Sequence, residues 1–118
     1  MADVFVVEDV SLQQTIIGSF LQPEHTVVGT ATDGKEAIER IKAQKPDVAI
    51  MDINLPSVDG LTAAEEIKSH SPETRIIIST ALVNDEIKQL ANEIPIEGYL
   101  IKPYSAPELL EAIEDAIE

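Results

Sequence analysis

Five side chains that could do chemistry stand where apolar runs of this sequence end: Glu8, Asp9, Asp52, Thr80 and Lys102. Three of them are carboxylates, and carboxylates that share a site repel one another. A hard divalent cation removes that repulsion, because Mg²⁺ prefers oxygen ligands from one or two carboxylates, from carbonyls and from water. A hydroxyl and an ammonium group complete the set. If the fold brings these residues together, a cation site is one explanation of the acids, beside a basic partner or solubility alone.

Each of the five residues also has a simpler explanation when it is taken alone. Asp9 could cap a helix that begins near Ser11, and Asp52 could hold the loop that follows it. Lys102 could be the counter-ion of the nearest carboxylate, and Thr80 suits a strand through its β-propensity. Whether the five residues act together therefore depends on the elements that position them.

Five short apolar runs, mostly without polar alternation, predict strands that are covered on both faces of a parallel sheet. The runs are Val4–Val7, Thr26–Thr30, Val48–Met51, Ile76–Thr80 and Tyr99–Ile101. Apolar stripes at helical spacing lie between and after the runs, within residues 12–21, 37–41, 61–68, 83–94 and 109–117. The first stripe begins at Leu12, the fourth includes Val83 and Leu90, and the last ends at Ile117.

The strict alternation of five strands and five helices predicts a doubly wound α/β sheet with right-handed crossovers. Asp59 is a plausible cap for the third helix, and Ser105 with Glu108 has the spacing of a capping box before the last one. Such sheets bind ligands outside the carboxyl ends of their strands. All five chemical side chains follow or end a strand, so we expect them at that one edge.

The composition favours a single globular domain, which we expect to span residues 1–118. The chain has 22 acidic and 8 basic residues and a formal net charge of −14, which argues against nucleic acid as a direct ligand. It has no cysteine, and none of its apolar runs approaches the length of a bilayer span. No signal-like segment precedes Val4, so we expect a soluble, cytoplasmic protein that has no membrane partner.

The order and spacing of these motifs resemble a response-regulator receiver domain of a two-component system, with a chemotaxis-regulator-like fold. The resemblance rests on the acidic pair after the first strand, the stretch MDINLPSVDG around Asp52, Thr80, and Lys102-Pro103 with Tyr99 just ahead. It implies a flavodoxin-like sheet of order 2-1-3-4-5 with helices on both faces. It also implies a signalling switch, not an enzyme acting on other substrates, in which Asp52 takes a phosphoryl group from a histidine kinase or histidine phosphotransfer protein.

The same resemblance implies a bound Mg²⁺, or Mn²⁺ in its place. Its ligands would be Asp9, Asp52, the backbone carbonyl of Asn54, and Glu8 through a bound water. Electrostatics agrees, because an anionic nucleophile that attacks a phosphohistidine needs its charge neutralised first. Asn54 and Leu82 stand at positions that tune the lifetime of the phosphoryl group in similar regulators, and a bulky Leu82 would hinder an attacking water.

Similar regulators also imply roles for the residues of the last two strands. Lys102 would place a fixed positive charge on the phosphoryl oxygens, and a cis bond to Pro103 would restrict it. Thr80 would offer its hydroxyl to the same oxygens and pull the following loop inward. Tyr99 would then move from an exposed to a buried position, so that a two-state element reads out a local change of charge.

Two other classes of protein stay open on the residues alone. A Mg²⁺-dependent phosphohydrolase would carry a second acid two residues after its nucleophile, but this chain has Asn54 there, which cannot relay a proton. A flavodoxin-type FMN module needs a glycine- and hydroxyl-rich loop after the first strand, where Glu8 and Asp9 would repel the phosphate. Turnover of a chromogenic phosphate ester would identify the first class, and flavin absorbance the second.

The charges of the last two helices indicate which kind of output partner such a switch would have. The last helix carries acids without any Lys or Arg, namely Glu108, Glu111, Glu114, Asp115 and Glu118. The preceding helix sets Asp85, Glu86 and Glu93 against Lys88. Two copies that met through these helices would bring like charges together, which disfavours association. We therefore expect a monomer whose output runs through a different protein with a basic patch, or through an effector domain outside this chain.

Overall fold

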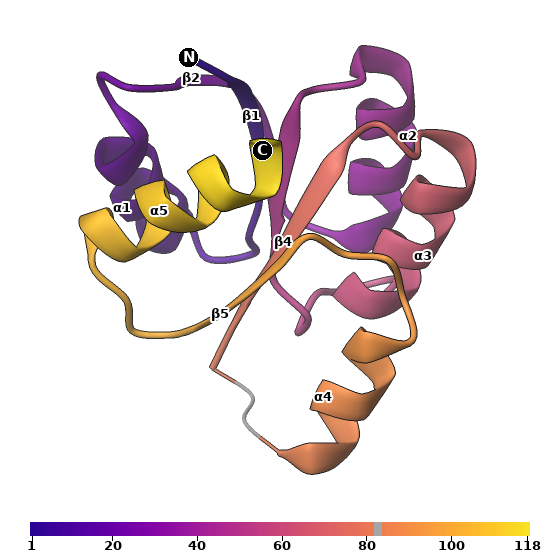
Figure 1. Ribbon diagram of the computed structural model, residues 1–118. Helices are drawn as coiled ribbons and strands as arrows, with labels where there is room; N and C mark the ends of the chain where they lie inside the picture. Colours follow the sequence, from indigo (N-terminus) through magenta and orange to yellow (C-terminus); the bar gives the residue numbers. More distant parts are fainter. Residues whose placement is uncertain (82–83) are drawn as a thin grey trace.

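Five parallel strands form one sheet in the computed structural model, which describes residues 1–81 and 84–118 (Figure 1). The strands are β1 (Asp3–Val7), β2 (Thr26–Ala31), β3 (Val48–Met51), β4 (Arg75–Thr80) and β5 (Gly98–Ile101). They lie in the order β2-β1-β3-β4-β5. The helices that alternate with them are α1 (Ser11–Leu21), α2 (Gly34–Gln44), α3 (Gly60–His70), α4 (Asp85–Asn92) and α5 (Ala106–Ile117). The predicted fold class and the strand order are confirmed.

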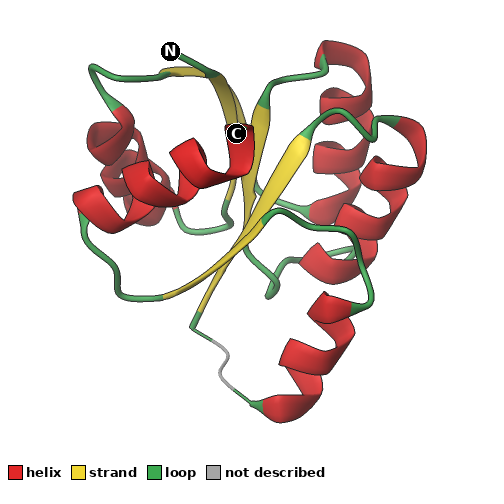
Figure 2. Ribbon diagram, viewed as in Figure 1, coloured by secondary structure: helices red, strands yellow, loops and turns green. Residues whose placement is uncertain are grey.

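The sheet lies between two helical layers, with α1 and α5 on one face and α2 and α3 on the other (Figure 2). The residues of β1 alternate between the two apolar clusters that result. Val4 and Val6 pack with residues of α1 and α5, whereas Phe5 and Val7 pack with residues of α2 and α3. All four are at most 1% exposed. Because both faces are covered, the strand needs apolar residues at every position, as the continuous run predicted.

The two edge strands are covered less well than their apolar runs predicted. In β2, Thr26, Val28 and Thr30 are exposed and alternate with better covered residues. Ile101, at the end of β5, is 40% exposed. Both strands lie at the ends of the strand order, where a sheet reaches past the helices that cover its centre.

Several residues of the predicted helical stripes are not buried, so these predictions were wrong in detail. Leu12 is 66% exposed, Leu90 is 44% exposed and Ile117 is 38% exposed. Leu12 and Ile117 lie in terminal turns, where a helix has fewer neighbours, and α4 buries Ala91 rather than Leu90. Val83 lies outside the described residues. None of the described helices is both long and apolar enough to cross a membrane.

Side chains cap four of the helices that the structure describes. Asp33, Asp59 and Asn84 each accept a hydrogen bond from the backbone N–H three residues ahead. Ser105 and Glu108 form the predicted capping box at the start of α5. A cap of this kind stabilises a helix by about 1 kcal/mol. The caps of α3 and α5 fix where the loops after β3 and β5 end, and these loops border the carboxyl edge of the sheet.

Candidate functional site

The carboxyl edge of the sheet brings the three predicted carboxylates together. β1 and β3 are neighbours, and their parallel pairing ends at Val7 and Met51, so the residues that follow lie side by side. The amide of Asp52 extends the pairing by donating to the carbonyl of Val7 at 3.1 Å. Carboxylate oxygens of Glu8, Asp9 and Asp52 all lie within 4.8 Å of one another. The acidic pair after β1 and the acid after β3 therefore form one cluster.

Lys102 reaches into this cluster from the end of β5. Its Nζ donates to Oδ2 of Asp52 at 3.0 Å and also pairs closely with Oε1 of Glu8. Burial alone lowers the pKa of the Lys102 ammonium, but its hydrogen bonds to the two carboxylates outweigh that effect and raise the pKa above its usual value. Lys102 thus stays charged and offsets part of the negative charge at this edge.

Glu8 is the most deeply buried acid of the cluster. It is 1% exposed, whereas Asp9 is exposed to solvent. Burial raises the pKa of the Glu8 carboxyl, and the neighbouring Asp52 raises it further, while the hydrogen bond from Lys102 opposes both effects. A carboxylate in such surroundings favours a nearby positive charge, which Lys102 supplies in part.

The simpler explanations of these acids fit only in part. Residue Val10 occupies the N-cap position of α1, and no side-chain hydrogen bond caps that helix, so Asp9 is not its cap. Asp52 does hold the following loop, because its Oδ1 accepts a hydrogen bond from the amide of Asn54 at 3.2 Å. Lys102 is indeed a counter-ion, although of two carboxylates. Asp9 therefore belongs to the carboxylate cluster and does not cap α1.

Thr80 ends β4 at the same edge of the sheet. It is 1% exposed, and its carbonyl accepts a hydrogen bond from the amide of Lys102 at 2.8 Å. Tyr99, in β5, is half-buried and packs against the apolar cluster of α2 and α3. Burial raises the pKa of its phenol. Leu82, predicted to affect the phosphoryl lifetime, lies outside the described residues.

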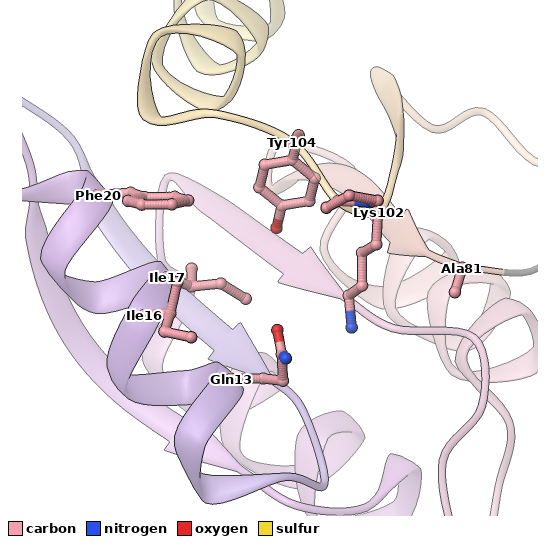
Figure 3. Close-up of a pocket in the computed structure, with 8 residues that line it drawn as sticks. Gln13, Ile16, Ile17, Phe20, Ala81, Lys102 and Tyr104 are labelled. Carbon is pink, nitrogen blue, oxygen red and sulfur yellow. The ribbon is translucent and has the colours of Figure 1, made fainter.

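A hollow of about 470 Å³ opens beside the ammonium group of Lys102 (Figure 3). One wall is α1, which contributes Gln13, Ile16 and Phe20, and the other wall includes Tyr104. Phe20 and Tyr104 meet edge to face, with ring centroids 6.4 Å apart. Apart from Gln13, Lys102 and the Tyr104 hydroxyl, its described lining is apolar, so it offers an apolar surface next to the charged cluster.

Ser79 and Tyr104 form a contact that the sequence reasoning missed. The Ser79 hydroxyl is hydrogen-bonded to the Tyr104 hydroxyl at 2.8 Å, and Ser79 is 1% exposed. Ser79 immediately precedes Thr80, and Tyr104 follows Lys102 by two residues. This bond therefore ties the end of β4 to the loop after β5, next to two of the predicted site residues. Burial raises the pKa of the Tyr104 phenol, and the bond to Ser79 opposes that shift.

The substitution Tyr104→Phe should lower the free energy of unfolding by about 1 kcal/mol at neutral pH, because it leaves the buried Ser79 hydroxyl without its partner. In the wild type, the unfolded phenol loses its proton near its usual pKa of about 10 while the folded one keeps it, so stability falls as the pH rises through that value. The variant has no phenol to contribute to this fall, so the difference between the two proteins should shrink. Urea unfolding at neutral pH and at about pH 10.5 measures both effects; a difference that does not change with pH would contradict the pKa assignment.

The two histidines lie away from this edge. His25 precedes β2 and His70 ends α3 before β4, so both are near the amino ends of strands. His25 is buried, and its Nδ1 accepts a hydrogen bond from the amide of Ala2 at 3.1 Å. Neither histidine therefore lies at the carboxyl edge.

Comparison with known proteins agrees with the fold. The family model of the response regulator receiver domain matches residues 4–114. The chemotaxis protein CheY of Halobacterium salinarum is 32% identical over 114 residues, which are 97% of this chain and 95% of that protein. The transcriptional regulatory protein PdtaR of Mycobacterium tuberculosis is 36% identical over 115 residues, but this chain spans only 56% of its length.

One solved structure is similar to this chain along nearly the whole length of both. The receiver domain of a sensor histidine kinase from Pseudomonas aeruginosa, with a magnesium ion coordinated in its active site cleft, has a TM-score of 0.88 and 28% identity. The match covers 98% of this chain and 97% of that domain. Strand order, the acidic cluster and the family match agree, and the chain belongs to the response regulator receiver domain family of two-component signalling switches.

Proposed function

We propose that this chain is the phosphoacceptor of a two-component system and that Asp52 receives the phosphoryl group. The observation that carries this proposal is the meeting of Asp52 with two further carboxylates and with Lys102 at the carboxyl edge of the sheet. The Asp52 side chain is 11% exposed, so a donor can reach it from one side while the fold holds it from the others. A carboxylate in this position is a nucleophile of the kind that forms aspartyl phosphates.

In the proposed reaction, an oxygen of Asp52 bonds to phosphorus while the bond from phosphorus to the histidine nitrogen breaks. The electron pair of that bond stays on the imidazole of the donor. Lys102 already lies 3.0 Å from Asp52, so its ammonium group can hold the phosphoryl oxygens as they arrive. Thr80 ends the neighbouring strand β4 and offers its hydroxyl to the same oxygens.

The donor set fits a divalent metal, because hard oxygen ligands from three carboxylates lie within 4.8 Å of one another. We assign Asp9, Asp52 and the backbone carbonyl of Asn54 as direct ligands of Mg²⁺ or Mn²⁺, and Glu8 as a ligand through water. When bound, the ion neutralises the carboxylates and the phosphoryl oxygens. The magnesium ion in the similar receiver from Pseudomonas aeruginosa supports this assignment.

The hollow beside Lys102 supports a protein as the phosphoryl donor. A histidine kinase or histidine phosphotransfer protein has to present its phosphohistidine close to Asp52, and the apolar wall that includes Ile16 and Phe20 offers surface for such a partner. A small phosphate ester would leave this apolar surface unused. The side chain two residues after Asp52 is the amide of Asn54, which also disfavours a phosphohydrolase.

We propose that phosphorylation is read out through Thr80 and Tyr99. The backbone carbonyl of Thr80 accepts a hydrogen bond from the amide of Lys102, and Tyr99 lies half-buried on the adjacent strand β5. A shift at the phosphoryl group can therefore reach both residues. The acids of α5 are exposed, which supports a monomer that acts on a partner of opposite charge. In this proposal residues 1–118 form one receiver unit, and an effector is either a separate protein or a domain outside this sequence.

Incubation with acetyl phosphate and Mg²⁺ tests the phosphoacceptor function. Intact mass spectrometry should show the addition of one phosphoryl group, and chelation of the metal with EDTA should prevent it. Incubation with a chromogenic phosphate ester should show no turnover. A protein that gains no phosphoryl group with metal present, or that hydrolyses the ester repeatedly, would contradict the proposal.

The variant Asp9→Asn should be more stable than the wild type when no metal is present, by up to about 1 kcal/mol, because it removes a negative charge from a cluster of like charges. The gain should appear as a rise of a few degrees in the melting temperature. The same change should weaken the stabilisation that Mg²⁺ gives to the folded state. Thermal unfolding with and without Mg²⁺ measures both, and an undiminished effect of Mg²⁺ on the variant would show that Asp9 is not a ligand.

A further inference from the structure

A groove of about 400 Å³ lies between α3 and α4, on the opposite face of the sheet from the hollow beside Lys102. Buried or half-buried apolar side chains form its floor, namely Ile53, Leu61, Ile87 and Ile94, and the exposed Leu90 lines its α4 side. Carboxylates stand on its rim, from Asp59, Glu65 and Glu93. The groove therefore combines an apolar floor with an acidic border.

The α4 wall of this groove is poorly covered by the part of the chain that the structure describes. Within α4 the buried residue is Ala91, while Ile87 is half-buried and Leu90 is 44% exposed. Figure 1 shows α4 below α3, apart from the centre of the sheet. Leu90 and Ile87 lie three residues apart, so they share one face of the helix. An apolar face that borders a hollow in this way is typical of a surface that takes a partner.

The charge around the groove selects among partners. No Lys or Arg is among the described residues that line it, whereas Lys102 lines the hollow beside α1 and Lys88 lines another hollow near Tyr99. A smaller hollow continues along α3 and shares Thr62 and Glu65 with the groove, and it adds Glu66 to the acidic border. A second copy of this chain, with its net charge of −14, would be repelled there.

We infer that the groove between α3 and α4 binds a segment of a different protein, in which large apolar side chains are flanked by Lys or Arg. The apolar side chains would cover Leu90 and fill the floor, and the basic side chains would meet Glu65 and Glu93 on the rim. An amphipathic helix meets these requirements, because it presents apolar residues at helical spacing with charges beside them.

The groove is also linked to the phosphorylation site, a step that rests on the proposed function. Ile53 follows Asp52 directly, and the start of α3 packs against the backbone of Asp52 at Gly60. The α4 wall follows Thr80 after a short segment of the chain. Because both walls begin next to site residues, the affinity of the groove for its partner changes when Asp52 is phosphorylated.

The groove itself can be tested without any phosphorylation. The probe is a fluorescein-labelled amphipathic peptide of about 16 residues, with Leu on one helical face and Lys on the other, together with a control peptide in which Ser replaces Leu. Fluorescence anisotropy with the full chain should show at least about tenfold tighter binding of the Leu peptide. Amide chemical shifts of the labelled chain should change around Leu61, Leu90 and Ile94. Equal affinity of the two peptides, or shift changes confined to α1 or α5, would overturn the inference.

Matched charge variants distinguish the effect of the rim carboxylates on peptide binding from the effect of the net charge of the chain. Glu65→Lys combined with Glu93→Lys should weaken binding of the Leu peptide by about tenfold. The control combines Glu24→Lys with Glu39→Lys, which makes the same change in net charge at exposed positions away from the groove. This control should weaken binding of the Leu peptide by no more than about twofold. Leu90→Ser is a second variant, in case the rim variant does not fold. Its affinity for the Leu peptide should also fall by about tenfold. Equal loss in the rim and control pairs would overturn the inference, as would a dimer in sedimentation that Leu90→Ser abolishes.

Beryllofluoride with Mg²⁺, a mimic of the phosphoryl group, tests the link to Asp52. The affinity for the Leu peptide should change by about fivefold or more. An unchanged affinity in a chain that acetyl phosphate labels would refute the link. If the chain is not labelled at all, the proposed function fails, whereas binding of the peptide to the groove is judged by the charge variants alone.

Discussion

The variant Asp52→Asn should gain no phosphoryl group from acetyl phosphate and Mg²⁺, whereas the wild type gains one. Among the described carboxylates, Asp52 combines a place at the end of the central strand β3 with a hydrogen bond from Lys102 at 3.0 Å and with two acids close by. An amide oxygen is a far weaker nucleophile than a carboxylate, so the reaction should be lost and not merely slowed. Intact mass spectrometry at several incubation times measures the difference.

The acid Asp115 offers a matched control for this substitution. It lies exposed on α5, and Asp115→Asn makes the same change of one carboxylate to an amide away from the carboxyl edge. Asp115→Asn should therefore be labelled as fast as the wild type. Labelling of Asp52→Asn at the wild-type rate would refute the assignment. Labelling at a lower rate, with peptide mapping to Asp9, would contradict the expected loss and show that a neighbouring acid accepts the phosphoryl group directly.

How much of the fold could be predicted from the sequence depended on burial. The boundaries of β3 were predicted to the residue, because Val48–Met51 is buried on both faces and each position has to be apolar. In the other strands the pattern missed residues at the ends, such as Arg75 and Gly98, since pairing continues past the apolar run. Helical spacing identified the buried face of α1, but it could not show that the first turn, with Leu12, lies in solvent.

The candidate site was largely predictable because parallel strands end at one edge of a sheet. Residues that end strands are then neighbours, whatever their distance in sequence. Some side-chain pairs were not predictable, as Lys68 shows. It is the last residue of the third predicted stripe, which lies within residues 61–68, and it is 7% exposed, as that stripe predicts. Nothing in the stripe indicated that its Nζ would donate hydrogen bonds to Glu97 at 2.6 Å and to the carbonyl of Thr74 at 2.9 Å. The bond between Ser79 and Tyr104 was missed for the same reason, because it depends on how two separate elements pack.

The substitution Gly60→Ala should destabilise the chain by about 3 kcal/mol or more, at the upper end of the range for overpacking. A Cβ atom at residue 60 would lie 1.9 Å from the carbonyl oxygen of Asp52 and 2.7 Å from the Cα of Ile53. Both are backbone atoms, so no side chain can turn aside to relieve the contact. Gly60 has no positive φ, so the requirement for glycine comes from space and not from conformation. Urea unfolding of the purified variant measures the loss.

The variant Gly18→Ala supplies the control, because the two changes add the same methyl group. A Cβ atom at Gly18 would meet nothing within 4 Å among the described atoms, and residue 18 lies inside α1, so Ala there should stabilise the chain by about 0.5–1 kcal/mol. Gly60→Ala has a second consequence, since the start of α3 can make room only if the backbone of Asp52 moves. The phosphorylation rate of the folded variant should therefore fall, while that of Gly18→Ala should not. If Gly60→Ala matched the wild type in both stability and rate, the close packing of α3 on Asp52 would not exist in solution.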